Sequence, residues 1–154
     1  MVWGRSSKSL LEYKKSMDSY NYQVETTVNI DEIVSQCQLI ITCTPSEKAL
    51  INKVNPGTHI TAIGSDTTVK RELSSSVLLQ ADAVITDSKS QSRERGEIYQ
   101  ASKDGFSGKS TLELGNIITG AVKGRTSQDQ ITIADLTGVA VQDIQISKAV
   151  LRNL

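Results

Sequence analysis

The stretch that decides the fold is His59–Leu73 (HITAIGSDTTVKREL), an apolar run followed by a loop that contains a glycine and an acid. The stretch Ile131–Gly138 (ITIADLTG) has the same arrangement near the other end of the chain. In open α/β sheets, ligands bind at the carboxyl ends of the strands. Both loops are therefore the first places where we expect chemistry.

Short apolar runs alternate with helical patterns along the rest of the chain. Strands are predicted at 2–3, 23–27, 39–42, 59–63, 83–86 and 131–134. Helices are predicted at 7–20, 72–80, 91–101, 112–119 and 141–151, with a further helix ending at 36 and a glycine-containing loop at 103–109. Alternation of this kind is typical of parallel βαβ units. The sequence therefore predicts an α/β fold with a parallel sheet.

The charge balance excludes several classes of function. The 154 residues carry 17 basic and 17 acidic side chains, so electrostatic capture of nucleic acid or of an anionic membrane is not expected. No apolar run approaches the roughly 20 residues that span a bilayer, and no signal-peptide core is visible, so we expect a cytoplasmic protein. Two cysteines outside any CxxC pair and one histidine predict no metal site.

A series of short motifs runs along the chain in a fixed order. The motifs are Val2–Ser6 (VWGRS), Thr42–Ser46 (TCTPS), Pro56–Ile60, Gly64–Asp66 with Lys70, Glu72 and Leu73, Asp87–Ser88 with Gln91, Gly96–Glu97, Glu113–Gly115, Gly124–Arg125, Ile131–Thr132 and Asp135–Asp143. Together they resemble the ornithine cyclodeaminase/mu-crystallin family of NAD(P)-dependent enzymes over essentially the whole chain. The resemblance implies a Rossmann-like parallel sheet with helices on both faces. It also implies a small amino or imino acid substrate and a homodimeric full-length parent.

The resemblance also predicts that part of the dinucleotide domain is missing. Family members are longer, and their dinucleotide domain opens with a strand and a glycine-rich turn, whereas no GxGxxG motif occurs among the ten glycines here. We expect residues 1–130 to form a truncated NAD(P)-binding Rossmann domain, without its first strand and turn. Residues 131–154 are expected to supply the last strand and a closing helix. On this expectation the full-length parent is the enzyme and the chain alone is inactive.

Six residues are predicted to contact the cofactor, namely Arg5, Ser6, Thr44, Pro45, Lys70 and Gly138, the last of which is described with the catalytic residue below. Arg5 and Ser6 follow the strand that carries the ribose selector in Rossmann domains, and no acid stands there to hold a ribose 2′-hydroxyl. An arginine can hold a 2′-phosphate instead, which favours NADP over NAD, although a solvated arginine is the alternative. The resemblance places Thr44 and Pro45 beside the cofactor ribose and Lys70 against the cofactor. A plain proline turn and a surface lysine are the alternatives.

Asp66 is the predicted catalytic residue. The resemblance assigns acid/base work near the substrate amine or imine carbon to this aspartate, and a raised pKa would suit proton exchange. The alternative is an Asx turn or helix N-cap. Gly138 is expected in a loop that closes over the nicotinamide, with a close approach or a positive φ. His59 is predicted to be structural, and the alternating charges of Arg93–Glu97 predict a solvated helix face.

The sequence leaves three functions open for the full-length parent. The main interpretation is NAD(P)-dependent reduction of a cyclic imino acid of the pyrroline-2-carboxylate type, or amino-acid dehydrogenation. The alternative is ornithine cyclodeaminase, a lyase that forms proline and ammonia from ornithine. A further alternative is a non-catalytic NADP-binding protein or an inactive fragment. All three share the cofactor-side residues, so these residues do not distinguish them.

Overall fold

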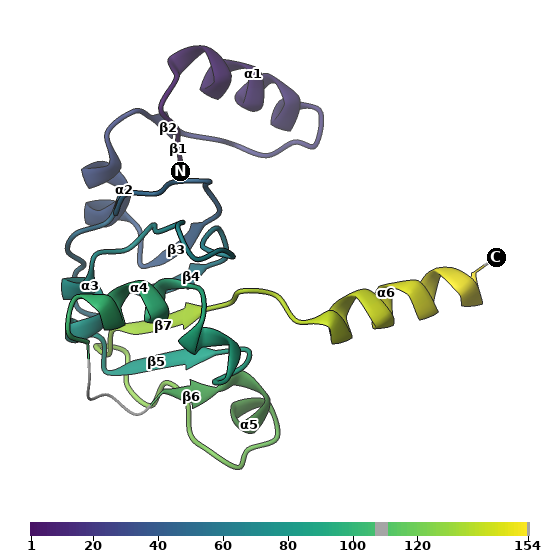
Figure 1. Cartoon of the computed structure of the whole chain (residues 1–154). Helices are drawn as coiled ribbons and strands as arrows, with labels where there is room; N and C mark the ends of the chain where they lie inside the picture. The colour runs from purple at the N-terminus through teal and green to yellow at the C-terminus, as the bar shows by residue number, and fades with distance from the viewer. Residues whose placement is uncertain (107–110, 154) are drawn as a thin grey trace.

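The computed structural model describes residues 1–106 and 111–153 (Figure 1). Its centre is a five-stranded sheet in the order β3-β4-β7-β5-β6. The strands are β3 Leu39–Thr42, β4 His59–Ala62, β5 Ala83–Thr86, β6 Leu112–Glu113 and β7 Thr132–Asp135. Every pair in this sheet is parallel, so all five carboxyl ends lie along one edge.

The last strand in sequence, β7, lies in the middle of the sheet. It pairs with β4 on one side and β5 on the other, and all four of its residues are buried. Ile60 and Ile133 stand opposite each other in register and form the centre of the hydrophobic core. β3 lies at one edge, where the side chains of Leu39 and Ile41 are 64% and 62% exposed.

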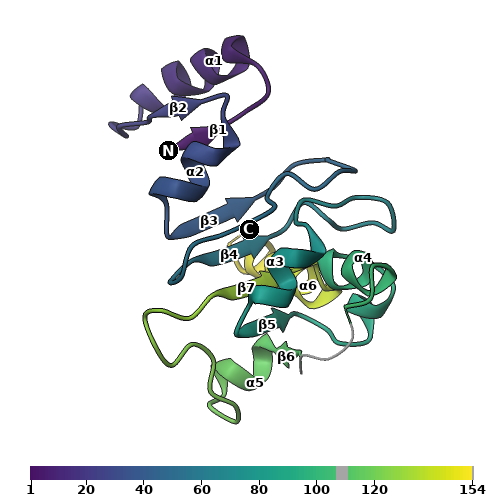
Figure 2. The ribbon, with the colours of Figure 1, turned by 90° about the vertical axis from the view of Figure 1, so that its left-hand side faces the viewer.

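Helices lie on both sides of the sheet, as the sequence predicts for a parallel α/β fold. Figure 2 shows α2, α3 and α4 in front of the sheet and α6 behind it. The helices of the main body are α2 Ile30–Gln36, α3 Ser75–Gln80, α4 Glu97–Lys103, α5 Leu114–Ile118 and α6 Ala140–Arg152, and a 3₁₀ turn covers Gln91–Arg93. Figure 1 shows α6 extending away from the sheet. Most of its large apolar residues, such as Ile146 and Leu151, are exposed.

A second, smaller sheet holds the first residues of the chain. β1 Val2–Trp3 pairs in parallel with β2 Thr26–Thr27, and α1 Ser7–Asp18 connects them. Among the described residues β1 is not paired with β3, and the two sheets stay separate. The expectation that a further strand belongs between Val2–Trp3 and Leu39–Thr42 remains a prediction.

Three predicted helices have different boundaries in the structure. Residues 72–74 are not helical, and α3 begins at Ser75. The predicted helix 91–101 is broken before Glu97, because Gly96 has a φ of 94°. The predicted helix 112–119 begins as strand β6, because its first residues pair with β5. In the predicted loop 103–109, Lys103 ends α4, and residues 107–109 lie outside the described residues.

Candidate functional site

The site is built from loops that leave the carboxyl edge of the sheet. The loop after β3 contains Thr44, and the loop after β4 contains Gly64 and Asp66. Backbone bonds continue between these loops beyond the strands, since the Ile63 amide donates to the Thr42 carbonyl at 2.9 Å. The parallel topology therefore brings residues far apart in sequence to one edge, as expected for a ligand site in an open sheet.

Three of the predicted cofactor residues line one cavity of about 260 Å³. Arg5 enters it from the end of β1, and Thr44 and Pro45 enter it from the end of β3. Ser6 does not line this cavity. Its hydroxyl instead accepts from the Ser9 amide at 3.4 Å and caps α1.

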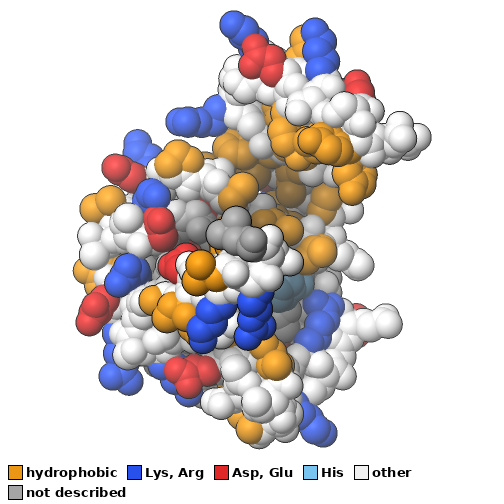
Figure 3. Space-filling view, turned by 90° about the vertical axis from the view of Figure 1, so that its right-hand side faces the viewer, with side chains coloured by type: hydrophobic (Ala, Val, Ile, Leu, Met, Phe, Trp, Pro, Cys, Tyr) orange, Lys and Arg blue, Asp and Glu red, His pale blue; other side chains and the backbone are white. Residues whose placement is uncertain are grey.

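An apolar groove of about 470 Å³ adjoins the Arg5 cavity, between the small sheet and β3. Its lining includes Val2 and Trp3 from β1, Ile33 from α2, and Leu39 and Ile41 from β3. Figure 3 shows hydrophobic side chains gathered in the hollow between the upper lobe and the body of the molecule. The two spaces share part of their lining, so the groove leads directly to the predicted cofactor residues.

Asp66 and Lys70 form an ion pair beside the loop after β4. Lys70 Nζ lies 2.6 Å from Asp66 Oδ1, and the Asp66 side chain is 51% exposed. The hydrogen bond from Lys70 holds the pKa of Asp66 below its usual range. The expected raised pKa is therefore wrong, because the lysine stabilises the carboxylate. Lys70 is directed to Asp66, a contact that the sequence analysis did not predict.

Glu72 joins the two loops that carry Thr44 and Asp66. Its side chain is completely buried, with Oε1 accepting from the Thr44 amide at 2.5 Å and Oε2 from the Gly64 amide at 3.0 Å. Gly64 makes the close approach possible. A Cβ on Gly64 would lie 2.4 Å from the Thr44 carbonyl oxygen and 2.6 Å from the Glu72 carboxylate carbon. No pattern in the sequence predicts this role of Glu72, and Gly64 is the one local sign of the close approach.

Glu97 holds the backbone of the Glu72 segment in turn. It is 1% exposed, and its oxygens accept from the amides of Glu72 at 2.6 Å and Leu73 at 3.0 Å. Burial raises the pKa of Glu97 to about 7. The prediction of a solvated face is right for Arg93 and Glu94 and wrong for Glu97, because the break at Gly96 turns this side chain inward.

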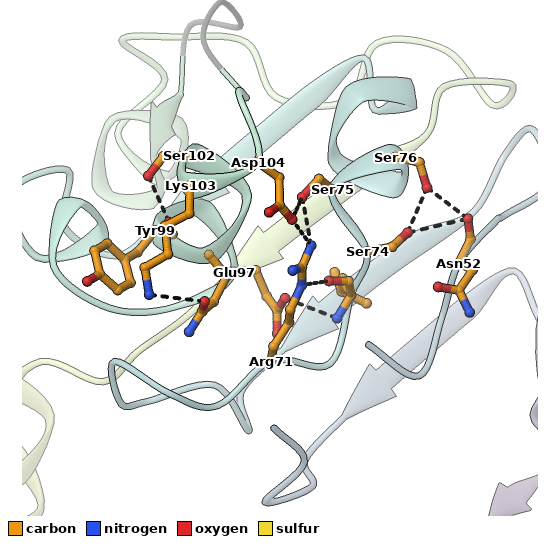
Figure 4. Close-up of polar contacts among 12 residues, drawn as sticks. Asn52, Arg71, Ser74, Ser75, Ser76, Glu97, Tyr99, Ser102, Lys103 and Asp104 are labelled. Atoms are coloured by element: carbon orange, nitrogen blue, oxygen red, sulfur yellow. Dashed lines mark hydrogen bonds and ion pairs between the residues drawn. The ribbon is translucent and has the colours of Figure 1, made fainter. Parts of the chain in front are cut away.

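Arg71 fastens the same segment from the outside (Figure 4). Its Nη2 donates to Asp104 Oδ2 at 2.6 Å and to Ser75 Oγ at 2.7 Å, and its Nε donates to the Leu73 carbonyl. Asp104 follows the end of α4 and Ser75 begins α3. Both helices therefore hold the segment 71–73, which explains why α3 starts later than the sequence predicts.

Asp135 ends β7 as a buried carboxylate. Its Oδ2 accepts from the Ile98 amide at 2.8 Å, and Oδ1 has no hydrogen-bond partner among the described residues. Burial raises the pKa of Asp135 to about 6. Gly96 allows the contact, since a Cβ there would lie 2.7 Å from the carboxylate oxygens. Asp135 thus fixes the first turn of α4 to the central strand.

Gly138 has the positive φ that the sequence predicts, at 83°. Its amide donates to Asp87 Oδ2 at 2.8 Å, and its carbonyl accepts from Gln91 Nε2 at 2.6 Å. The loop after β7 is therefore fixed to the loop after β5. A Cβ on Gly138 would meet no atom within 4 Å, so the conformation and not a close approach explains the glycine.

His59 lies at the start of β4, at the end of the strand opposite Asp66. Its ring nitrogens bind the hydroxyls of Thr132 at 2.7 Å and Thr61 at 3.2 Å, which fits a structural role. Within residues 1–106 and 111–153, no three His, Cys, Asp or Glu side chains are grouped as a metal site would require. Over the same ranges, no helix is long and apolar enough to cross a membrane.

The sequence matches the family model described as "Ornithine cyclodeaminase/mu-crystallin family" over residues 1–154. The chain belongs to this family. The alanine dehydrogenase of Archaeoglobus fulgidus is 37% identical over 134 residues, which cover 84% of this chain and 41% of the relative. A Bacillus cereus Delta(1)-pyrroline-2-carboxylate reductase is 33% identical over 153 residues, covering 96% of the chain and 47% of the relative.

Solved structures of family relatives have the same fold. An archaeal alanine dehydrogenase dimer with bound NAD superposes with a TM-score of 0.87 at 30% identity, over 99% of this chain and 49% of that one. The iminosuccinate reductase of Paracoccus denitrificans in complex with NAD⁺ superposes with a TM-score of 0.88 at 29% identity, over 97% of this chain and 47% of that one. These matches confirm the predicted Rossmann-like fold. The chain spans less than half the length of each of these relatives.

The buried Glu97 carboxyl predicts a pH-dependent stability. Its pKa is raised from about 4.5 to about 7, so the folded chain holds this proton more tightly than the unfolded chain. The contribution of Glu97 to the free energy of unfolding should therefore be fully present below pH 4.5 and decrease by about 3 kcal/mol as the pH rises through 7. Glu97→Gln should lack this decrease in urea titrations at a series of pH values.

The exposed Glu94→Gln is the matched control for this test and should follow the wild-type curve. Burial also raises the pKa of Asp135, so this residue adds a pH dependence of its own and Glu94→Gln shows the curve with both carboxyls present. A stability difference between Glu97→Gln and wild type that stays constant from pH 4 to pH 8 would contradict the prediction.

Proposed function

We propose that the protein to which this chain belongs is an NAD(P)-dependent oxidoreductase acting on a small amino or imino acid. Reduction of a cyclic imino acid of the pyrroline-2-carboxylate type, or the reverse oxidation of an amino acid, is the reaction we favour. The observation that carries the proposal is that two loops leave the same sheet edge and are joined by Glu72: the Thr44 loop, which lines the Arg5 cavity, and the loop that carries the Asp66–Lys70 pair. The reductase and dehydrogenase names of the relatives support it.

The cavity lining fits the ribose end of a phosphorylated dinucleotide. Arg5 brings a positive charge, Thr44 and Ser46 bring hydroxyls, and none of the lining residues is an acid. An acid would favour the free 2′-hydroxyl of NAD, whereas an arginine favours the 2′-phosphate of NADP. We therefore propose NADP as the preferred cofactor, with the adenosine ribose beside Arg5.

Asp66 is the proposed catalytic residue in this reaction. Bound NAD(P)H supplies the hydride that reduces a carbon–nitrogen double bond, and NAD(P)⁺ accepts it in the reverse direction. Lys70 keeps Asp66 ionised, so the carboxylate is suited to stabilise a positively charged iminium or to accept a proton from a substrate amine. Its exposure leaves it accessible to a small substrate.

Ornithine cyclodeaminase activity is the second candidate. An ornithine cyclodeaminase of Agrobacterium fabrum is 31% identical over 84% of this chain and 36% of the relative. Product analysis separates the two candidates. Net consumption of NAD(P)H with a cyclic imine supports the reductase, whereas proline and ammonia from ornithine without net cofactor change support the lyase.

We also propose that residues 1–130 form a Rossmann domain that a further strand completes, and that residues 131–154 add the last strand and a terminal helix. The separate sheets support the proposal, because in the described part of the chain the edges of β1 and β3 that border the groove carry N–H and C=O groups without ladder partners. The archaeal relative is described as a dimer, which supports a homodimeric parent. We also propose that the protein is located in the cytoplasm.

Asp66→Asn should lower kcat about 10²- to 10⁴-fold in a protein that joins this chain to the half that its relatives also have. The affinity for the cofactor should stay nearly unchanged, because the substituted side chain keeps its size. Asp129→Asn is the control, because Asp129 is exposed and precedes β7, at the sheet edge opposite Asp66. A mutant that retains most of its kcat would show that Asp66 is a turn residue.

Arg5→Ala should weaken NADPH binding about 10- to 100-fold more than NADH binding, because it removes a charge-assisted hydrogen bond to the 2′-phosphate. Fluorescence titration of the same joined protein measures both affinities. Lys8→Ala removes a neighbouring charge that does not line the cavity, and it should leave the ratio of the NADPH and NADH affinities unchanged. Equal losses for the two cofactors would contradict the NADP proposal.

The isolated 154-residue chain should bind NAD(P)H weakly or undetectably. On this proposal the turn whose amides hold the pyrophosphate comes with the further strand, and among the described residues no strand lies between β1 and β3, so their open edges favour aggregation. Calorimetric titration with sizing of the purified chain tests both points. A soluble monomer with a low-micromolar Kd would refute the proposed placement of the further strand.

A further inference from the structure

Three buried carboxylates form a continuous series behind the loops of the site. Asp135 on β7 binds the backbone of α4, Glu97 on α4 binds the backbone of the Glu72 segment, and Glu72 binds both site loops. None of the three is in an ion pair within the described residues. Each carboxylate therefore acts on backbone amides, and the series connects the central strand to the edge where ligands bind.

Glu72 is the member of the series that touches both halves of the site. One oxygen holds Thr44, which lines the Arg5 cavity, and the other holds Gly64, two residues before Asp66. The width of a single carboxylate thus fixes the separation of the two amides. Movement of either loop would break one bond and leave a buried charge with half of its partners, which is unfavourable.

Glu97 restrains Glu72 through the main chain. Both of its oxygens accept from consecutive amides, so the peptide that carries the Glu72 side chain has a fixed orientation. α4 is fixed in turn by the bond from the Ile98 amide to Asp135. The location of Glu72 is therefore set from β7, the most buried strand of the sheet.

We propose that Glu72 is a positioning residue that keeps the cofactor loop at Thr44 and the acid/base loop at Asp66 in one fixed arrangement, with Glu97 as its support. The proposal rests on the proposed function for the roles of the two loops. It assigns a function to Glu72, which does not itself line the cavity.

Glu72→Gln tests the proposal with almost no change in shape. Both carboxylate oxygens accept hydrogen bonds, but an amide offers one acceptor, so one loop amide would face an N–H donor. Hydrogen exchange of the isolated chain, followed residue by residue, should be about 10- to 100-fold faster at Thr44 or Gly64. Amides inside β4 and β7 should keep their wild-type rates.

Glu47→Gln is the control, because Glu47 is exposed in the same loop as Thr44. It should leave exchange at Thr44 and Gly64 unchanged. Unchanged rates at both amides in Glu72→Gln, or an equal increase at every amide of the chain, would overturn the proposal. The second pattern would indicate general destabilisation without a specific effect on the loops.

If Glu72→Gln does not fold, Glu97→Gln tests the same proposal by hydrogen exchange. Exchange should become faster at Glu72 or Leu73, one of which loses its acceptor directly, and also at Thr44 or Gly64, which depend on Glu72. An increase confined to Glu72 and Leu73 would overturn the proposal, because the site loops would then be independent of this support.

Cofactor titration of the joined protein separates positioning from simple stability. Well below its melting temperature, the Glu72→Gln variant should bind NADH and NADPH more weakly by the same factor, and its kcat should also be lower. Arg5→Ala, in contrast, should change the ratio of the two affinities. Wild-type affinity and kcat in folded Glu72→Gln would overturn the positioning role. If the parent protein binds neither cofactor, the proposed function fails, whereas the exchange experiment still decides whether Glu72 holds the loops.

Discussion

The carboxylate of Glu72, held between the amides of Thr44 and Gly64, is the interaction on which the site depends. It is a buried anion without a cation in the described part of the chain, so backbone dipoles alone offset its desolvation. Such an arrangement is favourable only if both amides point at the oxygens. The requirement for a bare Gly64 follows directly, because any side chain there would displace the carboxylate.

Environment gives the carboxylates at the sheet edge different tasks. Asp66 is half exposed and paired with Lys70, which lowers its pKa and keeps it charged and reachable. Glu97 and Asp135 are buried, which raises their pKa values and limits them to contacts inside the protein. The residue suited to chemistry is therefore the exposed one, while the buried ones determine where it lies.

The strands of the main sheet could be predicted from sequence because each is a short apolar run with a turn signal after it. β6 could not, since Leu112–Glu113 becomes a strand only by pairing with β5. The family motifs identified Thr44 and Asp66, but not the partners of Glu72, which lie 28 and 8 residues away in sequence. Glu97 was missed for a related reason. Its neighbours form an ordinary charged pattern, and the inward turn depends on the φ of Gly96.

The Arg5 cavity and the apolar groove are physically linked, because some residues line both. Trp3 from the small sheet and Thr44 from the main sheet contribute to each space. The distance from Arg5 to Thr44 therefore depends on how the two sheets are held together. On the proposal that a further parallel strand lies in the groove, that strand would pair with β1 and β3 at once and fix this distance. Filling the groove and forming the ribose site would then be a single event, so cofactor affinity would report directly on completion of the sheet.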